Sequence, residues 1–75
     1  MTTAEFRNVG EALYGSRWQR PLARAIGVSD RWVRRLAAGE RQVSDHIEFE
    51  ALKLLYSRRN EMTALATKLG KRLVH

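Results

Sequence analysis

Residues 19–40 read QRPLARAIGVSDRWVRRLAAGE, and this stretch decides the fold. Gly27 can adopt the left-handed backbone that ends a helix, and Ser29 is a residue type that caps the start of the next one. The spacing therefore predicts a helix over residues 18–26 and another over residues 30–38, joined by a tight turn.

Helix signals continue on the N-terminal side of this stretch. Thr2 and Glu5 have the spacing of a capping box, so a first helix is expected to begin at Thr2 or Thr3. Gly15 is its expected end. Pro21 fits the first turn of the helix after it, where the missing N–H has no intrahelical partner, which favours a start near residue 18 over an earlier one.

On the C-terminal side, Ser44 or Asp45 is expected to cap a fourth helix that continues well past Tyr56, with residues 45–70 helical. Two interpretations stay open: one unbroken helix, or a break at residues 57–60 after which a fifth helix folds back onto the core. Since no alternating β-branched run indicates a strand, we expect a single all-α domain of four or five helices over the whole chain.

The helix predicted over residues 30–38 has two different faces. At 100° per residue, Arg31, Arg34 and Arg35 form one stripe. The opposite side is apolar and carries Trp32, Val33, Leu36 and Ala37. Because unpaired charges are expensive to bury, the apolar stripe should face the core and the arginine stripe should face solvent or a partner.

This pattern resembles the helix-turn-helix of the phage-repressor and Cro-like (XRE-type) transcription regulators. The positions that match are small Ala23 where the helices cross, Gly27 in the turn, and apolar Val28, Val33 and Leu36. The resemblance covers residues 18–39 closely and the whole chain loosely. It departs at Pro21, which is unusual in the first motif helix, and at Trp32, where such regulators commonly carry a small hydroxyl residue. A repressor-like bundle with the motif at its second and third helices is implied.

The resemblance further implies that the third helix enters the major groove of double-stranded DNA. Arg34 and Arg35 are the expected base readers, because arginine pairs bidentately with guanine, and Arg31 reads a base or holds a phosphate. Asp30 would favour the helix N-terminus, orient Arg34, or accept from a cytosine. The expected phosphate contacts are Gln19, Ser29, Arg17, Arg20, Arg41 and Trp32. For Arg17, Arg20 and Arg41 an exposed solubilising role is the alternative, and for Trp32 partial burial.

The C-terminal third has apolar side chains on two sides of one helical wheel. A larger stripe runs from Ile47 to Leu73, interrupted by Arg58, and a smaller patch of Phe49, Leu52 and Tyr56 lies opposite. A helix with two apolar faces needs to bury both, so one should complete the core and the other should contact a second copy of the chain. The expected dimer contacts are Leu54, Leu55, Met62, Leu65 and Leu69. Two-fold symmetry would place two recognition helices about 34 Å apart on an inverted repeat. Residues 70–75 are expected to form a frayed basic tail.

Composition narrows the function classes. Fourteen lysines and arginines against eight acidic residues give a net charge of +6, which is typical of nucleic-acid binding. With no cysteine, disulfides and thiolate metal sites are excluded, and no apolar run is long enough to span a bilayer. His46 and His75 are isolated and the serines look like caps, so we expect no metal, no cofactor and no catalytic site.

These patterns favour a small cytoplasmic homodimer that binds a DNA operator as a repressor or autorepressor of the phage or mobile-element type. Its regulation would then come from its concentration, from autoregulation or from a regulatory partner protein, and small regulators of this kind include autorepressors and antitoxin-type proteins. The alternatives are a protein-interaction module whose basic face is merely solvated, and a protein that binds structured RNA.

Overall fold

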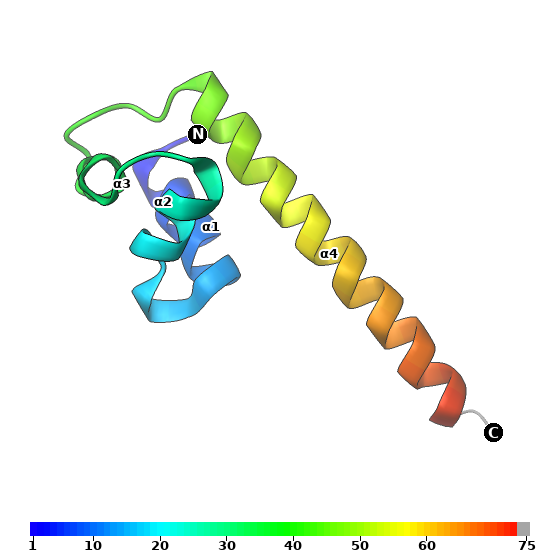
Figure 1. The fold of residues 1–75 in the computed structure, drawn as a ribbon. Coiled ribbons are helices and arrows are strands. Elements are labelled where there is room, and N and C mark those ends of the chain that lie inside the picture. The colour runs from blue at the N-terminus through cyan, green and yellow to red at the C-terminus, as the bar shows by residue number, and fades with distance from the viewer. Residues whose placement is uncertain (74–75) are drawn as a thin grey trace.

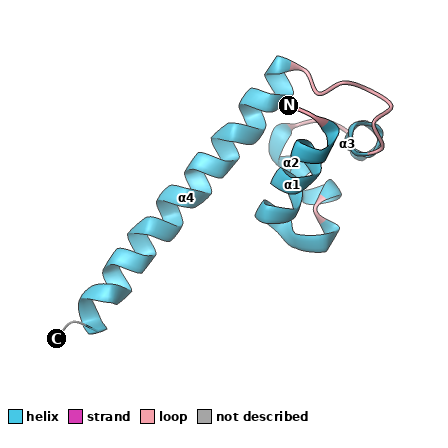
Figure 2. Cartoon of the chain, turned by 180° about the vertical axis from the view of Figure 1, so that it is seen from behind, coloured by secondary structure: helices cyan, strands magenta, loops and turns pink. Residues whose placement is uncertain are grey.

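The computed structural model describes residues 1–73, which form four α-helices, one 3₁₀ turn and no strand (Figures 1 and 2). The elements are α1 (Thr3–Tyr14), the 3₁₀ turn η1 (Gly15–Arg17), α2 (Gln19–Ile26), α3 (Asp30–Ala37) and α4 (Asp45–Leu73). The all-α expectation is confirmed for these residues. The three short helices pack into one body against the first half of α4.

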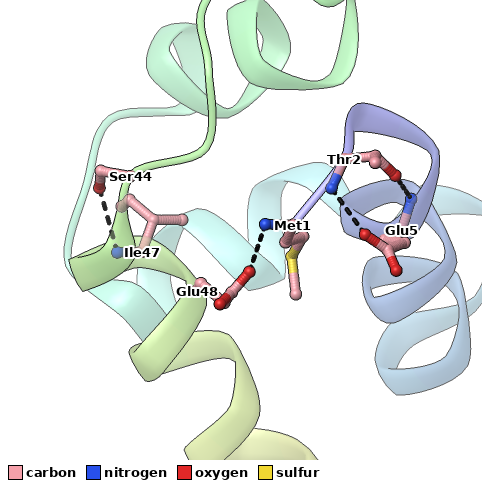
Figure 3. Close-up of polar contacts among 6 residues, drawn as sticks. All are labelled: Met1, Thr2, Glu5, Ser44, Ile47 and Glu48. Carbon is pink, nitrogen blue, oxygen red and sulfur yellow. Dashed lines mark hydrogen bonds and ion pairs between the residues drawn. The ribbon is translucent and has the colours of Figure 1, made fainter.

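The start of α1 is a complete capping box (Figure 3). The Glu5 N–H donates to Thr2 Oγ1 at 3.1 Å, and the Thr2 N–H donates to Glu5 Oε1 at 2.7 Å. The Thr2 backbone N–H, and after it the Thr2 hydroxyl, lower the pKa of the Glu5 carboxyl. The helix ends at Gly15, whose φ is +79°. The predicted start and end of α1 are therefore confirmed.

The turn between α2 and α3 also follows the prediction. Gly27 has φ +84°, and the N–H groups of Gly27 and Val28 both donate to the Ala23 carbonyl, at 2.9 and 3.0 Å. The Ser29 hydroxyl accepts from the Trp32 N–H at 3.0 Å and caps α3. Since α2 begins at Gln19, Pro21 lies in its first turn, as its missing N–H requires.

The core draws on all four α-helices and on the link before α2. Its fully buried large side chains are Phe6, Leu22, Val33 and Leu36. Trp18, only 4% exposed, packs edge-on against Phe6 with 5.5 Å between the ring centroids and 78° between the planes. Position 18 was predictable from the sequence only as the start of a helix, yet Trp18 is one of the largest side chains in the core.

Two polar contacts form near the start of α4, and the second of them ties the helix to the N-terminus (Figure 3). The Ser44 hydroxyl accepts from the Ile47 N–H at 3.2 Å, and Glu48 forms an ion pair with the amino group of Met1. This carboxylate raises the pKa of that amino group. Ile47 and Ala51, one turn apart, then bury their side chains in the core. The first two turns of α4 are thus tied to α1 by both polar and apolar contacts.

The second half of α4 decides one open alternative and corrects one expectation. The helix has no break at residues 57–60, so the unbroken helix is confirmed over the fifth helix that folds back; α4 leaves the body and continues to Leu73 (Figure 1). The frayed tail expected from residue 70 is wrong as far as Leu73, because the i to i+4 bonding of α4 propagates through Gly70. Val74 and His75, the rest of that tail, lie outside the described residues.

Candidate nucleic-acid interface

Helix α3 divides into a buried and an exposed face. Val33, Leu36 and Ala37 are buried, with Val33 at 0% and Leu36 at 1% exposure. On the other side Arg31 and Arg34 are exposed, and Arg35 is half-buried. The expected separation of an apolar and an arginine stripe is confirmed. Because the buried side of α3 packs against α1 and α2, the arginines project from a helix whose position is fixed by the core.

Both ends of α3 are closed by hydrogen bonds. Ser29 caps its N-terminus, and at its C-terminus Gly39, with φ +79°, ends the helix. The Glu40 N–H donates to the Arg35 carbonyl at 3.0 Å and the Gly39 N–H to the Leu36 carbonyl at 3.2 Å, which is the Schellman pattern. A helix this short has little stability of its own, so these caps and the buried stripe hold it in place.

The exposed side of α3 belongs to a larger surface made of adjoining shallow hollows. One hollow is lined by Arg31, Arg34, Arg35, Ala38 and Glu40. The next shares Arg34 and Ala38 with it and adds Arg7, Glu11, Trp18, Gln19 and Ala37. A third shares Gln19 and adds Ser16, Arg17 and Arg20. We call the cationic and amide residues of this surface the basic face: Arg7, Arg17, Gln19, Arg20, Arg31, Arg34 and Arg35.

The structure thus brings together six of the residues expected to contact DNA. Arg31, Arg34 and Arg35 line the first hollow, and Arg17, Gln19 and Arg20 line the third. Gln19 is the first residue of α2, where backbone N–H groups lack intrahelical partners and suit an anion. The arginines expected to read bases and the helix start expected to bind phosphate therefore belong to one continuous surface.

Asp30 has a different partner from the one expected. Its Oδ2 lies 3.2 Å from Arg20 Nε, so the carboxylate joins the start of α3 to α2 rather than orienting Arg34. The expectation for Arg34 is wrong in this structure because an arginine ten residues earlier in the chain is closer in space. Since the Arg20 side chain is 70% exposed, the pair contributes little to stability.

Three further expected contacts line none of the three hollows. Trp32 is half-buried and packs on the core, the alternative that had been left open for it. The Ser29 hydroxyl is already engaged as the α3 cap. Arg41 is exposed in the loop before α4.

Arg7 and Glu11 were missed by sequence reasoning. They lie one turn apart on α1 and line the hollow that also contains Gln19 and Arg34. Nothing in the local sequence of α1 indicates this, because the hollow exists only where α1 packs across α2 and α3.

The expected dimer contacts fall into two groups. Leu54 and Leu55 are half-buried against the core of their own chain, so only part of each side chain is left for a contact with a second copy. Met62, Leu65 and Leu69 are exposed, at 59%, 57% and 45%. The difference arises because the body covers α4 only as far as Arg58.

Arg58, the polar interruption of the apolar stripe, marks this boundary. Its Nη1 donates to the carbonyl of Leu13 at 3.3 Å, and its guanidinium lies 5.9 Å from the centroid of the Tyr14 ring. It therefore closes the C-terminal end of α1, where the helix dipole favours a cation. A lone arginine in an apolar stripe was the only sequence signal of this role.

The smaller apolar patch of α4 lies outside the core, and of its three residues only Leu52 is half-buried in the single chain. Phe49 is 59% and Tyr56 53% exposed. Lys53 lies 5.2 Å from the Phe49 centroid and Arg59 lies 5.0 Å from the Tyr56 centroid. Cations over the rings give this face a polar cover, which reduces its need for a partner.

Residues 1–73 include no group of three or more side chains that could hold a metal ion, and each of their buried side-chain nitrogens and oxygens has a hydrogen-bond partner. None of their helices combines the length and the apolarity that crossing a bilayer requires. Comparisons of the chain with protein-family models, curated proteins and solved structures found no match.

Proposed function

We propose that this chain is a sequence-specific, double-stranded-DNA-binding transcription regulator of the repressor-like helix-turn-helix type, in which α2 and α3 form the motif. One observation carries the proposal: Arg31, Arg34 and Arg35 project from one side of a helix whose other side is locked into the core. A fixed helix with an exposed arginine stripe suits insertion into a major groove.

The contacts divide between base reading and phosphate binding. Arg34 and Arg35 are assigned to base edges, since an arginine that pairs bidentately with guanine contributes about 1–3 kcal/mol of discrimination. Arg7, Arg17 and Gln19 are assigned to phosphates along the two hollows beside α3. The net charge of +6 adds attraction to any DNA, which falls as salt rises.

We further infer that the chain acts in the cytoplasm as a homodimeric repressor, or autorepressor, at an inverted-repeat operator. A domain this small has little core to stabilise it alone, and a two-fold dimer doubles the number of base contacts. Its action would be to occupy the operator and exclude the polymerase. The chain resembles regulators of phages and mobile elements only in its motif, so this part rests on analogy.

The test is selection of bound fragments from genomic DNA, followed by affinity measurements over a range of salt concentrations. The double variant Arg34→Ala, Arg35→Ala should bind the selected site at least about a hundredfold more weakly, because two base contacts are lost. The matched control is Lys53→Ala, Arg59→Ala, which removes the same charge from the far side of α4. It should weaken binding by less than about tenfold, since only general electrostatic attraction changes.

Two results would overturn the proposal. Equal losses in the two double variants would mean that only net charge matters, as for a protein-interaction module with a solvated basic face. Tighter retention on structured RNA than on any selected DNA would indicate an RNA-binding protein.

A further inference from the structure

The far half of α4 carries an apolar stripe that none of the described residues 1–73 covers. Every residue from 59 to 73 is exposed except half-buried Gly70. Met62, Leu65, Leu69 and Leu73 are 59%, 57%, 45% and 87% exposed, and with Ala66 they occupy one side of the helix. We call these five residues the α4 stripe. Figures 1 and 2 show this part of α4 running away from the body in both views.

A helix in this position needs a partner. Isolated helices of this length are marginal in water, because the backbone order they require is not offset by tertiary burial. Residues 59–73 also include Thr63, Thr67 and Gly70, none of which is a strong helix former. The stripe continues the line of Ile47 and Ala51, which are buried, so the same side of α4 that enters the core at one end is bare at the other.

We infer that the α4 stripe binds the same stripe of a second copy of this chain, with the two helices antiparallel. This inference specifies the contact surface of the homodimer in the proposed function. Its relevance to DNA binding rests on that proposed function. The two-fold axis of the helix pair passes midway between Met62 and Leu65. Met62 therefore faces the partner's Leu65, and by symmetry Leu65 faces the partner's Met62.

Charge favours this direction over the parallel one. Glu61 and Lys68 lie on the same flank of the stripe, and about this midpoint Glu61 comes beside the partner's Lys68 twice, by symmetry. Parallel pairing would instead bring Arg58 against its own copy and set the flank of Glu61 and Lys68 against the partner's opposite flank, which carries the uncharged Thr63 and Gly70. Like charges repel, so the sequence of α4 is self-complementary only when the helices are antiparallel.

At each end of the paired helices, the partner reaches side chains that the core of the first copy leaves half-buried. In this register the partner's Leu73, the most exposed leucine of its chain, arrives beside Leu54 and Leu55, which their own body covers only in part. The two bodies lie at opposite ends of the pair. Measured from Ala51, they are about 37 Å apart along the helices at 1.5 Å per residue, which is compatible with half-sites one turn of DNA apart.

The first test is the mass of the full chain in solution by sedimentation equilibrium at tens of micromolar. The double variant Leu65→Gln, Leu69→Gln should raise the dissociation constant of the dimer at least tenfold, while the chain stays folded because both side chains are exposed in the single copy. The control Phe49→Gln, Tyr56→Gln, on the opposite side of α4, should leave it unchanged. A monomeric parent chain, or equal weakening by the control, would overturn the inference.

The second test is the direction of the helices. The chain has no cysteine, so Lys71→Cys carries a single spin label. Lys71 lies opposite the stripe, so both labels are on outer faces of the pair. Antiparallel pairing separates the two labelled positions by about 22 Å along the axis, whereas parallel pairing puts them at the same level and therefore closer together. Glu61→Lys should weaken the dimer, and combination with Lys68→Glu should restore it; labels at the same level, or no effect of Glu61→Lys, would overturn the antiparallel arrangement.

These outcomes are separable from those of the proposed function. A dimer that binds no DNA would retain this inference and overturn the function. Specific DNA binding by a chain that stays monomeric would do the reverse.

Discussion

Gly10 lies directly against the indole ring of Trp18. A Cβ at position 10 would overlap ring atoms of Trp18, because the indole packs across the backbone of α1 to reach Phe6. A glycine in the middle of a helix, which local propensity disfavours, is thus required by the packing of a distant aromatic residue.

This relationship predicts that Gly10→Ala destabilises the protein. Alanine should add about 1 kcal/mol of helix propensity, but displacing a buried tryptophan costs about 1–3 kcal/mol, so a net loss is expected. Gly70→Ala is the control, since a Cβ there meets open space, and it should raise helicity and stability by up to about 1 kcal/mol. Chemical denaturation and far-ultraviolet circular dichroism measure both, and a Gly10→Ala protein as stable as the parent would contradict the packing.

Ser29→Ala should lower the free energy of unfolding by about 1 kcal/mol, because the Trp32 N–H at the start of α3 loses its acceptor. The affinity for DNA should fall together with the stability, since this cap holds in place the helix that carries the arginine stripe. Ser57→Ala, at an exposed position inside α4, is the matched control and should change stability by no more than about 0.5 kcal/mol. Equal effects in urea denaturation would show that the hydroxyl of Ser29 is not a cap.

Arg58→Ala should destabilise the protein by about 1 kcal/mol. The change removes a charged donor from the carbonyl end of α1 and a cation from the Tyr14 ring, and solvent screening of the partly exposed guanidinium limits the loss. The neighbouring Arg59→Ala should have about half that effect or less, since Arg59 contacts only the exposed Tyr56 ring. Thermal unfolding compares the two, and a larger loss for Arg59→Ala would refute the role given to Arg58.

Asp30→Asn should strengthen binding to nonspecific DNA. The substitution removes a negative charge beside the arginine stripe and releases Arg20, so the slope of log affinity against log salt should steepen by about one unit. Glu50→Gln, which releases Lys53 in the same way on α4, is the control and should leave the slope nearly unchanged. An unchanged slope for Asp30→Asn would mean that Arg20 does not reach a phosphate.

The lowered pKa of Glu5 predicts an acid-dependent loss of stability. A carboxyl with a lower pKa in the folded chain stabilises it fully above the ordinary glutamate pKa, and this contribution disappears as the pH falls from there through the lowered folded pKa. Glu5→Gln keeps an acceptor at the same place in the capping box but cannot ionise, so its stability should vary less over that range. NMR titration of Glu5 gives the pKa directly, and a value at or above the ordinary one would contradict the geometry.

Local chemistry explains which elements were predictable. The Thr2 capping box, Gly27, Ser29 and Ser44 act on hydrogen bonds within a few residues, so their positions in the sequence determined where helices begin and end. The buried and exposed faces of α3 were equally predictable from periodicity. What could not be predicted was the partner of each side chain: Arg20 for Asp30, Leu13 for Arg58 and Gly10 for Trp18.

The sequence by itself therefore determined an all-helical chain with a capped, arginine-bearing α3, because capping and helical periodicity are short-range effects. Only the tertiary structure decided that α1 contributes Arg7 beside Gln19 and Arg34, since these residues meet through packing across the body. It also decided where the core stops covering α4. The apolar stripe looks uniform in sequence, yet burial ends near Arg58, because three short helices are long enough to cover only the first half of a helix that continues to Leu73.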